Sequence, residues 1–384
     1  MIGREIFDSI LSKLHKGKVI IITGPRQSGK TTLLKQIIEK YGGNSILFLN
    51  CDEPDIKENL ENATSTKLRS LIGKNKLVLI DEAQKVNNIG LTLKLIVDNI
   101  KSIQLIVTGS SAFDLSNKLN EPLTGRKIEY CLYPFSTGEL INNSSLIEER
   151  RLLENRMIYG LYPDVVNNSS ESKIILKELS QSYLYKDLFM YKDIRNPGAL
   201  NKLITALALQ IGYEVSYNEL AQIVGIDKET VERYIELLEK VFVVFRLSSF
   251  SRNLRNEIKK SKKIYFYDNG VRNSIINNFN PLSMRKDAGE LWENFIISER
   301  KKFTEYNNIY KNAYFWRTHN QNEIDYLEER EGKLFAYEIK WNIKRKVKPP
   351  NSFKNAYPEH EFQVITPDNY LVSFIRLEDW RLED

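Results

Sequence analysis

The decisive stretch of this chain is residues 24–31, which read Gly24-Pro25-Arg26-Gln27-Ser28-Gly29-Lys30-Thr31. It has the pattern G-x-x-x-x-G-K-[ST], in which glycines let consecutive backbone N–H groups turn toward phosphate oxygens. A β-branched run precedes it at Lys18–Thr23, and apolar residues at helical spacing follow it from Thr31 to Lys40. Strand, glycine loop and helix therefore stand in the order that a phosphate-binding loop requires.

Each part of this loop has an expected role. The backbone N–H groups and the start of the following helix bind phosphates. Lys30 reaches the β- and γ-phosphates, and the hydroxyl of Thr31 holds Mg²⁺. We therefore expect a nucleoside triphosphate with Mg²⁺, bound by the residues Gly24, Pro25, Arg26, Gln27, Ser28, Gly29, Lys30, Thr31 and Thr32.

Composition indicates a globular protein of several domains. At 384 residues the chain exceeds one typical core, and its 42% hydrophobic and 28% charged residues are ordinary for a soluble protein. Its apolar runs are strand-sized, and Met1–Glu5 lacks the apolar region of a secretory signal. Two cysteines and three scattered histidines argue against a zinc site. We expect a cytoplasmic protein with no membrane partner.

The net charge of +6 is mild, but two stretches are locally basic, Arg252–Lys263 and Lys340–Lys354. Basic clusters fit nucleic-acid phosphates. They also occur as solvated charged surfaces, and the sequence leaves both interpretations open.

A second motif completes the nucleotide site. Lys76–Glu82 is an apolar strand that ends in two carboxylates, Asp81 and Glu82. This pattern predicts that Asp81 holds Mg²⁺ through water and that Glu82 polarises the attacking water. The alternative for two acids after a strand is a helix N-cap.

Two further residues are candidates for the same chemistry. The strand Ile103–Ser111 ends in hydroxyl groups, of which Thr108, Ser110 or Ser111 could sense the γ-phosphate, and we favour Ser110. Arg126 precedes the strand Lys127–Leu132. It is a candidate arginine finger, acting in its own site or in that of a neighbouring subunit, with a surface arginine as the alternative.

The order of the phosphate loop, Asp81-Glu82-Ala83-Gln84, Thr108-Gly109-Ser110-Ser111 and Gly125-Arg126 resembles the AAA+ ATPases of uncharacterised prokaryotic type. In these proteins an ATPase module precedes a winged helix and a nuclease-like domain, and Gly160-Leu161-Tyr162-Pro163 resembles their lid element. The resemblance implies ATP hydrolysis coupled to a conformational change, and relatives that commonly form homo-oligomers.

The middle of the chain carries a helix-turn-helix pattern. Ser216–Glu219 predicts a helix start, Gly225 the turn, and Asp227 the cap of a second helix. Val241–Ser248 and Lys263–Tyr267 are the expected strands of a wing. The outer face of the second helix is rich in glutamate, which disfavours the major groove of DNA, so a basic wing or a protein-contact role stays open.

The last third contains Glu293 on a helix, Asp325 on a strand, and Glu338 with Lys340 two residues apart. Residues two apart share one face of a strand, and a turn at Arg330–Lys333 brings the Asp325 strand alongside. This arrangement resembles the PD-(D/E)XK nuclease core, with Ile324 where that core often has proline, and implies metal-dependent phosphodiester cleavage. The alternative is an inert domain of the same fold, because Glu-x-Lys pairs are common on exposed strands.

We therefore predict an α/β protein with four parts. These are an AAA+ P-loop ATPase domain over 1–135, a helical lid over 136–195, a winged helix-turn-helix over 196–280 and a nuclease-like domain over 281–384. The expected function is ATP hydrolysis on or near DNA, with a metal-dependent nuclease site in the last part. The alternative is an ATP-controlled switch or adaptor that binds a protein partner.

Overall fold

The structure is a computed structural model that describes residues 2–43, 45–109, 123–183, 194, 196–251, 262–318, 320–343, 347–373 and 375. The chain divides into two compact units. The first comprises residues 1–135 with 240–242, and the second comprises residues 136–239 with 243–384.

The first unit is built on a parallel sheet of five strands in the order β2-β3-β4-β1-β5. The strands are β1 (Val19–Thr23), β2 (Ile46–Asn50), β3 (Leu77–Asp81), β4 (Gln104–Gly109) and β5 (Lys127–Cys131). Strands β1, β3 and β4 are almost completely buried, which explains their continuous apolar sequences. Strand β4 lies between the strand before the phosphate loop and the strand that carries Asp81.

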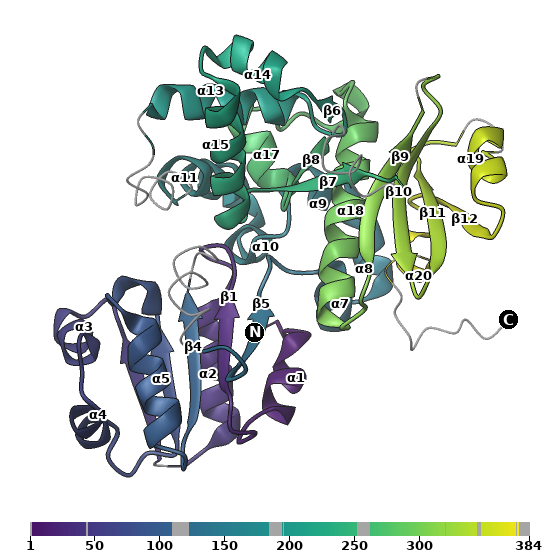
Figure 1. Ribbon diagram of the computed structural model, residues 1–384. Helices are drawn as coiled ribbons and strands as arrows, with labels where there is room; N and C mark the ends of the chain where they lie inside the picture. Colours follow the sequence, from purple (N-terminus) through teal and green to yellow (C-terminus); the bar gives the residue numbers. More distant parts are fainter. Residues whose placement is uncertain are drawn as a thin grey trace, which may run out of the picture. The chain divides into compact units, whose positions relative to one another are not determined.

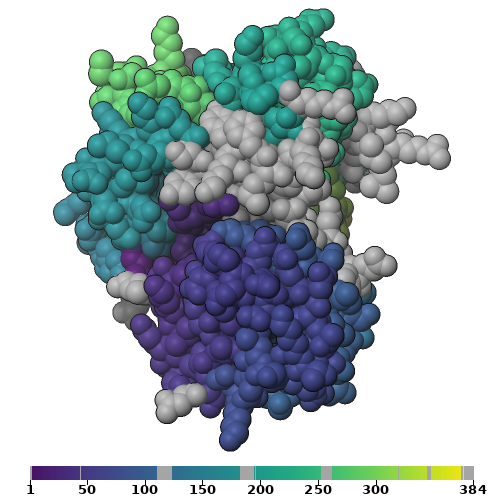
Figure 2. Space-filling model, turned by 90° about the vertical axis from the view of Figure 1, so that its left-hand side faces the viewer, coloured from purple at the N-terminus to yellow at the C-terminus, as the bar shows by residue number. Residues whose placement is uncertain are grey.

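Helices cover both faces of this sheet (Figure 1). They are α1 (Ile6–Ser12), α2 (Lys30–Tyr41), α3 (Pro54–Leu60), α4 (Ser65–Ile72) and α5 (Ile89–Asn99), with a 3₁₀ turn at Ala83–Lys85. One face of β1, β3 and β4 packs with α3, α4 and α5 in a single apolar cluster. Figure 2 looks onto the side of this unit that α3 and α4 form.

The second unit is built on a mixed sheet of seven strands in the order β12-β11-β10-β9-β7-β8-β6. The strands are β6 (Glu214–Val215), β7 (Val244–Ser249), β8 (Lys262–Phe266), β9 (Asn312–Arg317), β10 (Glu323–Arg330), β11 (Lys333–Ile339) and β12 (His360–Ile365). Strands β7 and β9 pair in parallel through Ser248–Tyr314 and Ser249–Phe315. The middle and the last third of the chain therefore share one sheet.

Twelve described α-helices surround this sheet. They are α7 (Thr137–Asn143), α8 (Leu146–Arg151), α9 (Leu153–Tyr159), α10 (Pro163–Asn167), α11 (Ser172–Glu178), α13 (Pro197–Leu209), α14 (Tyr217–Val224), α15 (Lys228–Lys240), α17 (Asn269–Ile275), α18 (Ala288–Tyr306), α19 (Asn351–Ala356) and α20 (Tyr370–Ser373). Short 3₁₀ segments occur at Ser169–Glu171 and Leu282–Met284, and a π-helical turn at Leu179–Tyr183. Among the described helices, none is long and apolar enough to cross a bilayer.

The predicted pair of helices in the middle of the chain is confirmed at its caps. Ser216 Oγ accepts a hydrogen bond from Glu219 N at 3.4 Å at the start of α14, and Gly225 ends that helix with φ +79°. Asp227 Oδ1 accepts one from Thr230 N at 2.7 Å at the start of α15. These side chains satisfy backbone groups that a helix end leaves without a partner.

The two strands expected as a wing also pair. Strands β7 and β8 are antiparallel, with Val244 opposite Phe266 and Ser248 opposite Lys262. The basic residues between them, 252–261, and the basic residues 344–346 lie outside the described part of the chain. Lys263, the last residue of the first basic stretch, is buried in an ion pair and is not part of a basic surface.

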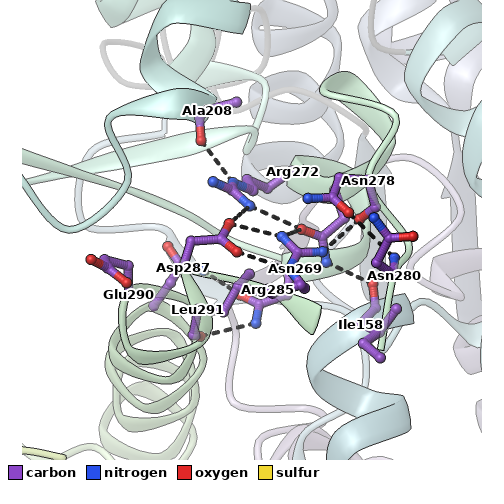
Figure 3. A network of polar contacts seen from close by, with 12 residues as sticks. Ile158, Ala208, Asn269, Arg272, Asn278, Asn280, Arg285, Asp287, Glu290 and Leu291 are labelled. Atoms are coloured by element: carbon purple, nitrogen blue, oxygen red, sulfur yellow. Dashed lines mark hydrogen bonds and ion pairs between the residues drawn. The ribbon is translucent and has the colours of Figure 1, made fainter. Parts of the chain in front are cut away.

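A buried polar network joins α17 to the start of α18 (Figure 3). Arg272 Nη1 lies 2.6 Å from Asp287 Oδ2, and Arg272 Nε donates to Ala208 O on α13 at 2.7 Å. Arg285 Nη2 lies 2.8 Å from the same carboxylate. Burial opposes ionisation of Asp287, but the hydrogen bonds from Arg285 and Arg272 lower its pKa to about 2. The network is a structural joint in which two guanidinium groups share one carboxylate.

The element Gly160–Pro163 belongs to a second joint of the same unit. Asp268 caps α17 by accepting from Val271 N at 3.0 Å, and its other oxygen accepts from Leu161 N at 2.7 Å. Gly160 has φ +73°, and a Cβ there would overlap the Asp268 carboxylate. Asp268 therefore has a structural role.

Candidate functional site

The phosphate loop has the backbone shape that its glycines predict. Gly24, Gln27 and Gly29 have φ values of +149°, +59° and +94°. A Cβ at Gly24 would overlap the carbonyl oxygen of Leu132, so this position requires glycine on steric grounds alone. The loop leads directly into α2, a helix of 12 residues that begins at Lys30. The positive end of that helix therefore faces the concave side of the loop.

Lys30 and Ser28 supply the polar atoms of the loop. The Lys30 side chain is 5% exposed, and its Nζ donates to Gly24 O at 2.9 Å and to Pro25 O at 2.7 Å. Ser28 is fully buried, and its hydroxyl has no hydrogen-bond partner among the described residues. A buried hydroxyl without a partner costs about 1–3 kcal/mol. An anionic ligand in the loop would satisfy it.

Thr31 and Asp81 come together at the carboxyl edge of the sheet. Thr31 Oγ1 donates to Asp81 Oδ2 at 2.6 Å. The hydroxyl of Thr108, on β4 between β1 and β3, donates to Asp81 Oδ1. Asp81 is 3% exposed. Of the three hydroxyl residues proposed to sense the γ-phosphate, Thr108 is thus placed at the site, whereas Ser110 and Ser111 lie outside the described residues.

Glu82 follows Asp81 in a left-handed backbone conformation, with φ +54° and ψ +39°. Residues other than glycine adopt this conformation at a cost, and such sites cluster where function requires an exact orientation. Glu82 N donates to Asp81 Oδ1 at 3.1 Å, and its Oε2 accepts from Gln84 Nε2 at 2.6 Å. Gln84 therefore orients the carboxylate of Glu82, a role that the sequence motif did not reveal.

Arg4 is a second residue that the sequence did not single out. Its side chain is only 7% exposed, and it donates to Ser28 O and to Tyr133 O, both at 2.6 Å. Its guanidinium also lies 5.0 Å from the ring centroid of Phe135. Arg4 thus fastens the phosphate loop to the chain that follows β5. An arginine so far from the motif in sequence carried no recognisable signal.

Arg126 does not join this group. It precedes β5, and Val19 N bonds to its carbonyl oxygen, so it lies at the amino edge of the sheet. The phosphate loop follows the carboxyl end of the parallel strand β1. Arg126 is 43% exposed and pairs with Asp98, its Nε lying 2.8 Å from Oδ1. A role as an arginine finger in its own site is therefore excluded by this geometry, and a role in a neighbouring copy stays a prediction.

The four residues predicted as a nuclease site lie in the second unit. Strands β10 and β11 form a tight hairpin with Arg330 opposite Lys333, as expected. Lys340 Nζ lies 3.1 Å from Asp325 Oδ2 and 2.7 Å from Glu338 Oε1. Asp325 Oδ2 also accepts from Ile339 N at 2.8 Å.

Glu293 approaches the same cluster from α18, together with residues from outside the predicted set. Its Oε1 accepts from Tyr265 OH at 2.5 Å and from Lys263 Nζ at 3.1 Å, and Lys263 Nζ lies 2.5 Å from Glu323 Oε1. Burial raises the pKa of Glu293 to about 7, which Lys263 opposes and Asp325 reinforces. Burial and Asp325 likewise raise the pKa of Glu338 to about 7. We call these six residues the carboxylate–lysine centre: Lys263, Glu293, Glu323, Asp325, Glu338 and Lys340.

The donor sets of the two sites differ in what they could hold. Within the part of the chain that the structure describes, no group of three or more His, Cys, Asp or Glu side chains is arranged to hold a metal ion. A phosphate-loop site does not need such a group, because one hydroxyl and one carboxylate suffice when phosphates and water complete the shell. A nuclease centre binds its metal ion through carboxylates, whereas here the ammonium groups of two lysines form ion pairs with them.

Three family models match successive parts of the chain. Residues 16–141 match an AAA domain, whereas residues 150–282 and 288–376 match two domains of unknown function, DUF8612 and DUF4143. Residues 16–141 are therefore similar to AAA-type P-loop domains. The structure agrees, since the matched segment holds the parallel sheet, the phosphate loop and the Thr31–Asp81 pair.

The chain is also similar to whole proteins of bacteria and archaea. An uncharacterised protein of Mycobacterium tuberculosis is 28% identical over 334 residues, which cover 85% of this chain and 71% of that protein. An uncharacterised protein of Methanocaldococcus jannaschii is 26% identical over 414 residues, covering 96% and 89%. These similarities extend beyond the AAA domain into both later segments.

Two solved structures are similar at low identity. A Walker-type ATPase of Pyrococcus abyssi gives a TM-score of 0.49 at 16% identity, over 72% of this chain and 96% of that chain. The Orc1 protein of Aeropyrum pernix in complex with DNA gives 0.36 at 11% identity, over 72% and 92%.

Proposed function

We propose that the protein hydrolyses ATP with Mg²⁺ in its AAA domain and that the nucleotide state sets the activity of the second unit. The observation that carries the proposal is the meeting of Thr31 and Asp81 at 2.6 Å beside the phosphate loop. This pair fits a magnesium ion, because a hydroxyl and a carboxylate are oxygen ligands of the kind that Mg²⁺ prefers. The bound ion neutralises charge on the phosphates.

The residues of the chain have separable tasks in this reaction. Lys30, now bound to two carbonyl oxygens, turns toward the β- and γ-phosphates, and Ser28 gains an acceptor for its buried hydroxyl. Glu82, held by Gln84, takes the proton of the attacking water as a general base. Thr108 donates to Asp81 and would hold that carboxylate in position for the ion. Arg126 completes the site only if a second copy of the chain supplies it, which makes the active form a homo-oligomer.

For the second unit we propose a winged helix, formed by α13 to α15 with β6, β7 and β8, fused to a nuclease-like domain that works as a protein-interaction module. The strand order supports the fusion, since β7 and β9 pair. On the outer side of α15, Glu229, Glu232 and Glu236 stand beside Lys228 and Arg233. Phosphates would be repelled by this helix in a major groove, which favours a protein partner over DNA.

The test is steady-state hydrolysis of ATP by the full chain, with and without duplex or single-stranded DNA. We expect Mg²⁺-dependent release of phosphate that Lys30→Ala abolishes, and no stimulation by DNA. An active Lys30→Ala variant would contradict the ATPase proposal. Stimulation by DNA would be consistent with the ATPase proposal, but it would contradict the proposal of a protein partner and favour DNA instead. Size-exclusion chromatography with ATP and with ADP tests whether nucleotide controls assembly.

A further inference from the structure

The carboxylate–lysine centre contains one lysine more than its resemblance to a nuclease accounts for. A nuclease core of this type brings two carboxylates and one lysine together, and Asp325, Glu338 and Lys340 correspond to them. Lys263 lies outside that set. It comes from β8, far earlier in the chain than the hairpin of β10 and β11.

Lys263 is held as a buried, fully engaged cation. Its side chain is 3% exposed, with Nζ 3.1 Å from Glu293 Oε1 and 2.5 Å from Glu323 Oε1. The same atom lies 5.5 Å from the ring centroid of Phe315. Tyr265, two residues along β8, donates to Glu293 from the same side of the strand. Two carboxylates and an aromatic face thus surround one ammonium.

We propose that Lys263 is the resident cation of this centre. Its ammonium supplies, between the helix carboxylate Glu293 and the strand carboxylate Glu323, the positive charge that a divalent metal ion supplies in a metal-dependent nuclease. The centre is therefore metal-independent, and it fastens the β7–β8 hairpin to α18 and β10 instead of cleaving phosphodiesters. This inference deepens the interaction role proposed above and does not depend on ATP hydrolysis.

The electrostatics of the cluster support the assignment. Burial opposes the charge on Lys263, but Glu293 and Glu323 outweigh it and raise the lysine pKa above its usual range, so the ammonium stays charged. A metal ion at the same carboxylates would meet a fixed like charge in a poorly solvated place. Lys340 adds a second ammonium at Asp325 and Glu338. The donors present therefore suit ammonium groups better than a divalent ion.

The experiment measures Mn²⁺ binding to the nucleotide-free full chain by isothermal titration calorimetry. Wild type and Asp325→Asn are compared, so that any binding near Thr31 and Asp81 cancels. We expect identical titrations, that is, no Asp325-dependent binding at millimolar Mn²⁺. Lys263→Ala should acquire an Asp325-dependent site, on the order of tenfold or more tighter than wild type. Lys263→Arg keeps the charge and should not acquire it.

One wild-type Mn²⁺ site that disappears in Asp325→Asn would overturn the inference. So would a folded Lys263→Ala variant that behaves like Lys263→Arg. If Lys263→Ala does not fold, the wild-type comparison decides the matter alone. Hydrolysis of ATP by the same preparations separates these outcomes from a failure of the proposed ATPase.

Discussion

The phosphate loop and the carboxylate–lysine centre each surround a buried lysine, but with different partners. Lys30 donates to two main-chain carbonyl oxygens, which carry no net charge. Lys263 lies between the carboxylates of Glu293 and Glu323. Lys30 thus lies against the backbone of the phosphate loop, whereas the ammonium of Lys263 lies between two carboxylates.

This difference separates a site built for a ligand from one built for the fold. In the phosphate loop a buried hydroxyl, that of Ser28, has no partner among the described residues, and Glu82 is held in a costly backbone conformation. In the carboxylate–lysine centre, ion pairs join α18, β8, β10 and β11. The comparison predicts that mutations at the first site affect turnover and that mutations at the second affect stability.

The largest effect should follow from Glu82→Gln. Loss of the general base should lower the rate of hydrolysis by about 10²–10⁴-fold, while nucleotide binding is retained. Phosphate release and binding of a fluorescent ATP analogue measure the two quantities. Asp325→Asn is the matched control from the other site and should leave the rate unchanged. A comparable fall in Asp325→Asn would break the separation between the two sites.

The pair Lys30→Met and Lys263→Met compares the two lysines directly. Loss of Lys263 leaves buried carboxylates without a counter-charge, so we expect a loss of about 3 kcal/mol in unfolding free energy. Loss of Lys30 removes hydrogen bonds to neutral carbonyl oxygens and should cost less, about 1.5 kcal/mol. Urea unfolding of both variants measures the difference. Equal losses of unfolding free energy in the two variants would show that the ion pairs of Lys263 do not contribute more to stability than the hydrogen bonds of Lys30.

The carboxylate–lysine centre should also make stability depend on pH. Burial and Asp325 raise the pKa values of Glu293 and Glu338 to about 7 in the folded protein, against 4.5 for an ordinary glutamate. The native state therefore binds more protons over this window, and the unfolding free energy should fall as pH rises from about 4.5 to 7, by up to about 3 kcal/mol for each of the two groups. The urea midpoint should depend less on pH across this range in the double variant Glu293→Gln/Glu338→Gln. An unchanged slope would assign the dependence to other groups.

The smallest effect concerns Arg4. Arg4→Ala removes two charged hydrogen bonds that hold the phosphate loop, so the affinity for ATP should weaken by about tenfold. Titration with the fluorescent analogue measures it, and Arg4→Lys, which keeps the charge but loses the forked geometry, should recover only part of the affinity. Full recovery in Arg4→Lys would mean that charge alone matters at this position.

Local sequence was sufficient to predict the residues of the phosphate loop, because the strand, loop and helix that position them are consecutive. Thr31 and Asp81 therefore meet at the carboxyl edge of the sheet. The same reasoning bears on one of the two roles predicted for Arg126. A residue that precedes a parallel strand lies at the amino edge of the sheet, opposite the carboxyl edge that binds ligands, and this rule excludes a finger in the same site.

Contacts between distant segments could not be predicted from motifs. Arg4 and Ser28 lie on either side of β1, and nothing in the sequence links them. Lys263 was misread, since it ends a basic stretch that suggested a charged surface, whereas the strand turns it inward against α18. The pairing of β7 with β9 likewise depends on tertiary structure that neither strand encodes alone.

The parallel contact between β7 and β9 has a practical consequence for anyone who divides this gene. The family boundaries suggest expressing residues 150–282 or 288–376 alone. Either fragment would lack one strand of the β7–β9 pair, so that an inner strand of the sheet would become an edge strand. The bared backbone would then be open to pairing with another molecule. Fragments cut at that boundary should precipitate, and a usable truncation must keep everything from Ser136 onward.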